Sequence, residues 1–195
     1  MTLARAAESA LVVVDIQAKL APAMPPDARR EVLSTVQTLL TAANDLTVPV
    51  VATEQYPKGL GETVSDVSGH FPEGARVVSK DSFSCCGEGS FSEALAATGA
   101  SQVVIAGMEA HVCVLQTAVE LAEAGYTPFV VEDGVCSRRA AHKANALERL
   151  RALGVTVTNV ESVLFEWLQR AGTDEFKRLA RLIRQRRPLP GRSPR

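Results

Sequence analysis

Three residues of different reactive types each follow a short apolar run in this chain of 195 residues. Asp15 and Lys80 stand at the ends of two such runs, and Cys113 lies just beyond a third, residues 103–106. Short apolar runs that alternate with helical stretches indicate parallel strands covered on both faces. Ligands of such sheets bind outside the carboxyl ends of the strands. The acid, the amine and the thiol are therefore predicted to meet in one pocket as an activated cysteine nucleophile.

The type of each residue predicts its part in the chemistry. Cys113 is expected in the first turn of a helix, where the macrodipole and a nearby Lys80 ammonium should lower the pKa of the thiol. Asp15 can take the thiol proton and then return it to a leaving amine. Backbone N–H groups near Glu109 and Cys113 can hold the oxyanion of a tetrahedral intermediate. The predicted reaction is thiolate attack on an acyl carbon, loss of amine or ammonia, and hydrolysis of the thioester.

The elements that must position these residues form an alternating pattern. Six strands joined by helical connections predict an α/β fold, a doubly wound parallel sheet with helices on both faces. The predicted strands are residues 11–15, 48–53, 75–80, 102–106, 127–132 and 155–158. The predicted helices are 27–46, one that starts at the capping box Ser90–Glu93, 111–124, one from the N-cap Ser137 to Leu153, 161–170 and 174–186. Residues 1–186 are expected to form a single domain, and residues 187–195 a basic, Pro-rich, disordered tail.

Two loops are expected to shape the pocket, because loops of such length in compact domains are usually functional. They are residues 54–74, rich in Gly and Pro, and residues 81–89. The side chains predicted to line the pocket lie in these loops or directly after the first two strands: Gln17, Glu54, Tyr56 and Phe83.

Composition excludes several classes of protein. A net charge of −1 gives no reason to expect nucleic acid or an acidic membrane as a partner. No apolar stretch approaches the roughly 20 residues that span a bilayer, and no secretion signal is evident, so a cytoplasmic location is expected. The turn after the first strand, residues 15–19, has no glycine that would admit a dinucleotide pyrophosphate.

Three segments together resemble the isochorismatase-like cysteine hydrolases. They are Val13–Gln17, Val78–Phe83 and Gly107–Val114, and the resemblance spans roughly residues 10–165. The sequence Thr53–Gly61 is most similar to the isochorismatase-domain-containing branch. The resemblance implies a catalytic triad of Asp15, Lys80 and Cys113, a cis peptide bond between Met108 and Glu109, and a homo-oligomer.

Departures from the family pattern narrow the substrate. The end of the second strand, Thr53–Pro57, lacks the Asp-x-His metal site of nicotinamidases, so neither a metal nor a cofactor is expected. True isochorismatases generally lack the cysteine that follows Ala110–Val112 here. A small amide or related acyl compound is therefore the expected substrate, and isochorismate and nicotinamide are disfavoured.

Two other classes of function stay open at this point. A reactive Cys113 also suits a redox-sensing thiol protein, with Cys85, Cys86 or Cys136 as a resolving cysteine. The fold can also serve as a catalytically silent scaffold for a binding partner. The apolar residues of the last two predicted helices can either form an interface between copies or cover the sheet.

Overall fold

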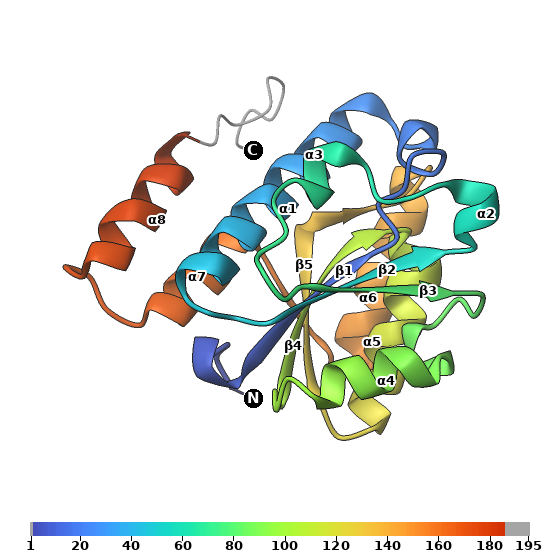
Figure 1. The fold of residues 1–195 in the computed structure, drawn as a ribbon. Helices are drawn as coiled ribbons and strands as arrows, with labels where there is room; N and C mark the ends of the chain where they lie inside the picture. Colours follow the sequence, from blue (N-terminus) through green and yellow to red (C-terminus); the bar gives the residue numbers. More distant parts are fainter. Residues whose placement is uncertain (1, 186–195) are drawn as a thin grey trace.

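The computed structural model describes residues 2–185, and the predicted tail at 187–195 lies outside that range. Within it, one parallel sheet of six strands has the order β3-β2-β1-β4-β5-β6 (Figure 1). The strands are β1 (Ser9–Val14), β2 (Val50–Gln55), β3 (Arg76–Lys80), β4 (Gln102–Met108), β5 (Thr127–Cys136) and β6 (Thr156–Thr158). The predicted doubly wound α/β fold is confirmed.

Helices cover both faces of this sheet (Figure 1). One face carries α1 (Pro26–Asp45) and α7 (Val160–Leu168), and α8 (Asp174–Gln185) packs on the outside of these two helices. The other carries α4 (Gly89–Ala96), α5 (Leu115–Glu123) and α6 (Ala140–Ala152). Two single-turn helices, α2 (Pro57–Leu60) and α3 (Ser65–Ser68), interrupt the long loop that was predicted after β2.

The central strand β1 shows how the sheet separates two cores. Leu11 and Val13 pack with the layer of α1, α7 and α8, whereas Val12 and Val14 pack with the layer of α4, α5 and α6. Burial on both faces explains why the strand reads as a continuous apolar run. Most apolar residues of α7 and α8 pack into the first of these cores, whereas Phe165 of α7 is exposed, and α8 packs against α1 and α7.

Strand order reverses between β1 and β4, because the chain proceeds outward from β1 through β2 to β3 and then outward again from β4 to β6. The crevice outside the carboxyl ends of two such strands is where open α/β sheets bind ligands. Asp15 follows the last residue of β1, and Met108 is the last residue of β4. The fold therefore places the predicted site at the switch point of the sheet.

Two helices start at residues other than those predicted. Helix α4 begins at Gly89 rather than at Ser90, and Glu88 before it accepts hydrogen bonds from the backbone N–H groups of Asp81 and Ser82 instead of capping the helix. Helix α6 begins at Ala140, since β5 continues to Cys136 and Ser137 shares a hydrogen bond with the His111 ring.

At Gly107 the backbone of β4 lies close to that of the neighbouring central strand β1. It has φ +133°, and a Cβ atom there would collide with the backbone oxygen of Val14 and lie 2.7 Å from its nitrogen. We expect Gly107→Ala to lower the free energy of unfolding by about 3 kcal/mol or more, measured by urea titration. Gly125→Ala is the control, because Gly125 also has positive φ but nothing lies within 4 Å of its Cβ position. Equal losses in the two variants would contradict the steric argument.

Candidate active site

The structure brings Asp15, Lys80 and Cys113 together from three elements. Asp15 follows β1, Lys80 ends β3, and Cys113 lies in a π-helical turn (Ala110–Val114) that connects β4 to α5. Asp15 Oδ2 lies 2.8 Å from Lys80 Nζ, and neither side chain is exposed to solvent. Both charged groups interact electrostatically with the Cys113 thiol. The predicted meeting of acid, amine and thiol is therefore observed.

Asp15 is held at both backbone and side chain. Its φ of +51° is left-handed, so the chain turns away from the strand direction directly after β1. Its Oδ1 accepts a hydrogen bond of 2.7 Å from the hydroxyl of Thr53 on β2. Its Oδ2 is buried beside the Lys80 ammonium and is not used by Thr53. Besides burial, a hydrogen bond between the Asp15 carboxylate and the Cys113 thiol helps to raise the pKa of that thiol. Oδ2 is thus the oxygen available to the thiol proton.

Lys80 is a buried ammonium with a full set of acceptors. Its Nζ donates to Gln55 Oε1 at 2.6 Å and to the carbonyl oxygens of Ser82 and Phe83 at 3.1 Å. Burial alone would lower the pKa of Lys80. The charge of the Asp15 carboxylate and its hydrogen bond to the ammonium, with smaller contributions from the Cys113 and Cys85 thiols, exceed this effect, so the pKa of Lys80 is raised. The lysine is therefore a fixed positive charge throughout the neutral range.

Cys113 is buried, and this overturns the expectation of a low thiol pKa. Only 5% of the residue is exposed, and its Sγ lies 4.0 Å from Gln55 Oε1. Burial, reinforced by the Asp15 carboxylate and only partly offset by Lys80, raises the pKa of Cys113 to about 12. The resting group is a thiol, because solvent exclusion outweighs the nearby ammonium that the sequence indicated.

The four residues predicted to line the pocket lie in different environments. Tyr56 and Phe83 are exposed, at 54% and 58%, and the Phe83 carbonyl bonds Lys80. Glu54 is buried, and its Oε1 accepts hydrogen bonds from the N–H and hydroxyl of Thr63. Gln17 is fully buried.

The amide of Gln17 binds backbone on two sides. Its Oε1 accepts from the Gln55 N–H at 2.8 Å, and its Nε2 donates to the carbonyls of Gln55 and Gly61. Gln17 thus fastens the end of β2 and the segment after it, and its predicted place in a pocket stays a prediction. Because Gln55 is fixed in this way, its own side chain presents Oε1 to Lys80 in one orientation.

The segment between β4 and the thiol contains the Met108–Glu109 peptide bond, which is cis, as the resemblance implied. The Glu109 carbonyl accepts hydrogen bonds from the N–H groups of Val112 and Val114. Its carboxylate accepts hydrogen bonds from the backbone N–H and the side-chain Nε–H of Arg138, which follows β5. These contacts fix the backbone on which the predicted oxyanion donors lie.

Sequence reasoning missed three partners of the triad: Thr53, Gln55 and Cys85. Thr53 and Gln55 are two residues apart on β2, so their side chains share a face. Cys85 Sγ lies 3.7 Å from the Thr53 hydroxyl, and burial raises the pKa of this thiol to about 11. The spacing of Thr53 and Gln55 was the available signal, since strand ends at a switch point face the site.

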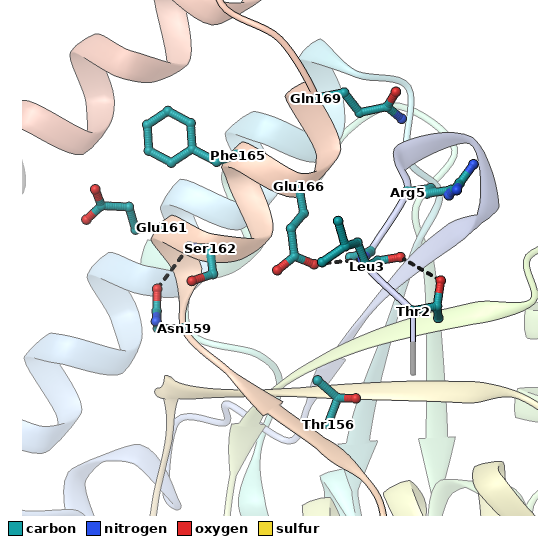
Figure 2. A pocket seen from close by; sticks show the side chains of 11 residues that line it. Thr2, Leu3, Arg5, Thr156, Asn159, Glu161, Ser162, Phe165, Glu166 and Gln169 are labelled. Carbon is teal, nitrogen blue, oxygen red and sulfur yellow. Dashed lines mark hydrogen bonds between the residues drawn. The ribbon is translucent and has the colours of Figure 1, made fainter.

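A broad surface hollow of about 1260 Å³ lies elsewhere on the molecule (Figure 2). It is lined by residues 2–5 before β1, by Thr156 at the start of β6, and by α7 residues such as Phe165 and Glu166. These strand starts lie at the edge of the sheet opposite Asp15 and Lys80, and the hollow includes none of the predicted site residues. It is therefore not the site of the predicted chemistry.

Within residues 2–185, no three His, Cys, Asp or Glu side chains are grouped so that they could hold a metal ion. None of the helices in that range combines the length and the apolar character needed to cross a bilayer.

Comparison with known proteins gives the family. Residues 9–162 match the family model of the isochorismatase domain. The chain belongs to the isochorismatase family. Isochorismatase domain-containing protein 2 of Danio rerio is 36% identical over 183 residues, which cover 94% of this chain and 90% of that protein. The resemblance stated from the three motifs is thereby confirmed.

Solved structures of other proteins share the fold. A structure described as MAR1 ribonuclease from Caenorhabditis elegans has a TM-score of 0.90 and 33% identity, and it covers 99% of this chain and 98% of its own. The YcaC gene product of Escherichia coli, described as an octameric hydrolase of unknown specificity, has a TM-score of 0.86 and 25% identity. That match covers 94% of this chain and 90% of YcaC. The family is one of hydrolases.

Proposed function

We propose that this isochorismatase-family hydrolase cleaves a small amide or related acyl compound through a thioester on Cys113. The observation that carries the proposal is the fully buried ion pair of Asp15 and Lys80, 2.8 Å apart, beside a buried thiol. A desolvated ion pair costs several kcal/mol in hydration, so a buried carboxylate and ammonium held next to a nucleophile point to proton transfer.

The raised pKa of the thiol sets the order of the steps. Asp15 Oδ2 takes the proton from Cys113 Sγ as the sulfur bonds to the acyl carbon, because the free thiolate is scarce at neutral pH. Lys80 compensates the negative charge that passes between thiol and carboxylate. The tetrahedral intermediate collapses as the protonated Asp15 gives its proton to the leaving nitrogen, and the amine departs. Water then adds to the thioester and gives a proton to Asp15. The carbon–sulfur bond breaks, Asp15 returns this proton to Cys113 Sγ, and the carboxylic acid departs.

The site favours a small, uncharged acyl group. Only 5% of Cys113 is exposed, so the thiol sits in a space that excludes bulk solvent. The two cations described at the site, Lys80 and Arg138, are each paired with a carboxylate, so neither offers an unpaired charge to a phosphodiester. We therefore propose a small-molecule substrate rather than RNA, although a structural relative is described as a ribonuclease.

The raised pKa also distinguishes the proposal from a redox-sensing role. Sensor cysteines react with oxidants as low-pKa thiolates, whereas burial raises the pKa of Cys113 to about 12.

We also propose a homo-oligomer and a cytoplasmic location. The octamer described for the E. coli relative supports the homo-oligomer.

Reaction with p-nitrophenyl acetate tests the proposed nucleophile without knowledge of the natural substrate. We expect release of nitrophenolate and an intact-protein mass increase of one acetyl group, located on Cys113 by peptide mapping. Cys113→Ala should lose both, and Cys136→Ala should lose neither, because Cys136 is equally buried but lies outside the triad. Acetylation that persists in Cys113→Ala at the wild-type rate would show that Cys113 is not the nucleophile.

A further inference from the structure

Thr53 of β2 contacts Asp15 at two points. Its carbonyl oxygen accepts the Asp15 N–H at 3.1 Å, which continues the pairing of β1 with β2 past Val14. Its hydroxyl donates to Asp15 Oδ1 at 2.7 Å. Thr53 is 1% exposed, so no water replaces either contact. Together these bonds fix both the left-handed backbone of Asp15 and the direction of its carboxylate.

A second contact orients the Thr53 hydroxyl. A threonine hydroxyl has one proton to donate and lone pairs that accept. The Cys85 thiol donates to Thr53 Oγ1 at 3.7 Å, so the lone-pair side of the hydroxyl faces Cys85. Asp15 Oδ1 can only accept, and the Thr53 proton is therefore directed at the carboxylate.

The consequence is that the two oxygens of Asp15 have different tasks. Oδ1 accepts the hydrogen bond of Thr53, whereas Oδ2 faces the Lys80 ammonium and stays available to the Cys113 thiol. Without the hydroxyl, Oδ1 loses this hydrogen bond, and the carboxylate can rotate so that Oδ2 is no longer held toward the thiol of Cys113. A hydrogen bond to the charged carboxylate also favours its ionised, proton-accepting form.

We infer that Thr53 is a positioning residue of this enzyme: through its hydroxyl it holds Asp15 so that Oδ2 can exchange a proton with Cys113. This role rests on the proposed function, because it concerns the proton transfer of the cysteine mechanism. In that mechanism Thr53 contacts neither the nucleophilic thiol of Cys113 nor the substrate. Its effect passes entirely through Asp15.

The test compares Thr53→Val, which replaces the hydroxyl by a methyl group of similar size, with Thr53→Ser, which keeps the hydroxyl. The readout is the pH dependence of the second-order rate of Cys113 acetylation by p-nitrophenyl acetate. Loss of a hydrogen bond to a charged group predicts a rate about 10- to 100-fold lower in Thr53→Val at neutral pH. The acidic limb of its profile should also move to higher pH. Thr53→Ser should stay within about threefold of wild type with an unmoved limb.

The outcomes separate the two ideas. If wild type acetylates Cys113 and the valine and serine variants do so with the same rate and the same acidic limb, the role of Thr53 is overturned while the cysteine mechanism stands. If wild type does not acetylate Cys113, the proposed function fails, and the role of Thr53 fails with it. Thermal unfolding monitors the fold of each variant. Should Thr53→Val not fold, Thr53→Ala takes its place in the same comparison with Thr53→Ser.

Discussion

Asp15→Asn is expected to make Cys113 more reactive toward alkylation while it nearly abolishes acyl transfer. The Asp15 carboxylate raises the pKa of the buried thiol, so a neutral amide at that position lets the Lys80 ammonium stabilise the thiolate instead. Alkylation by iodoacetamide at pH 8 should rise about tenfold, the equivalent of one pKa unit. Acetylation by p-nitrophenyl acetate and later hydrolysis should fall about 10³-fold, because the proton acceptor is lost.

Opposite changes in the two reactions identify Asp15 as the proton acceptor more firmly than loss of activity alone. A variant that merely unfolds would expose the thiol and be alkylated throughout its melting range, so near-ultraviolet circular dichroism must show the native fold. Asp45→Asn is the matched control, since Asp45 also forms an ion pair, with Arg178, but far from the thiol. If both reactions slow together in folded Asp15→Asn, the proton-acceptor role is wrong.

The second large effect is a loss of stability at alkaline pH. Burial raises the pKa of Cys85 to about 11, and those of Cys113 and Cys136 to about 12, from an ordinary value of 9.0. A group that holds its proton more tightly when folded stabilises the fold below the unfolded pKa, and this stability is lost as pH rises. Three thiols together should remove about 4 kcal/mol per pH unit above pH 10. That slope is large against the roughly 5–15 kcal/mol that stabilise a domain.

Free energies of unfolding from urea titrations under reducing conditions, at intervals between pH 8 and 11, measure this slope. Lys80 contributes in the same direction only above its own unfolded pKa of about 10.4, because its folded pKa is raised as well. Cys136→Ala lies outside the triad and should reduce the slope between pH 9.5 and 10.5 by about a third of its value. A stability that is flat to pH 10.5 in wild type would contradict the burial of the thiols.

The main chemical residues could be predicted because strand ends in a parallel sheet converge. The positions of Asp15 and Lys80 after apolar runs, together with the crossover rule, were enough to predict that they meet Cys113. The thiol pKa could not be predicted in the same way. Sequence indicates which charges are near, but the shift depends on how completely solvent is excluded, and that is a property of packing.

Side-chain partners were the other part that sequence left open. Ser90 and Ser137 match capping patterns, yet neither caps a helix, since Ser137 contacts His111 and α4 begins one residue before Ser90. Gln17 follows the first strand and was expected to face a ligand, and its position did not indicate that its amide binds the backbone of Gln55. Asn, Gln and Ser can satisfy several kinds of partner, so their type and position alone do not select one.

The division of the molecule into two cores has a consequence for how such proteins diverge. Cys113, Cys85, Thr53 and Lys80 all belong to the face of the sheet that carries α4, α5 and α6, judged by the cores they join or by the strand residues two positions away. The layer of α1, α7 and α8 contributes none of these four. Mutations in the layer of α1, α7 and α8 can therefore alter melting temperature while these four side chains keep their contacts. Asp15 is the exception, because it lies between Val13 and Ile16, which belong to the core of that layer, and so links the two halves of the molecule.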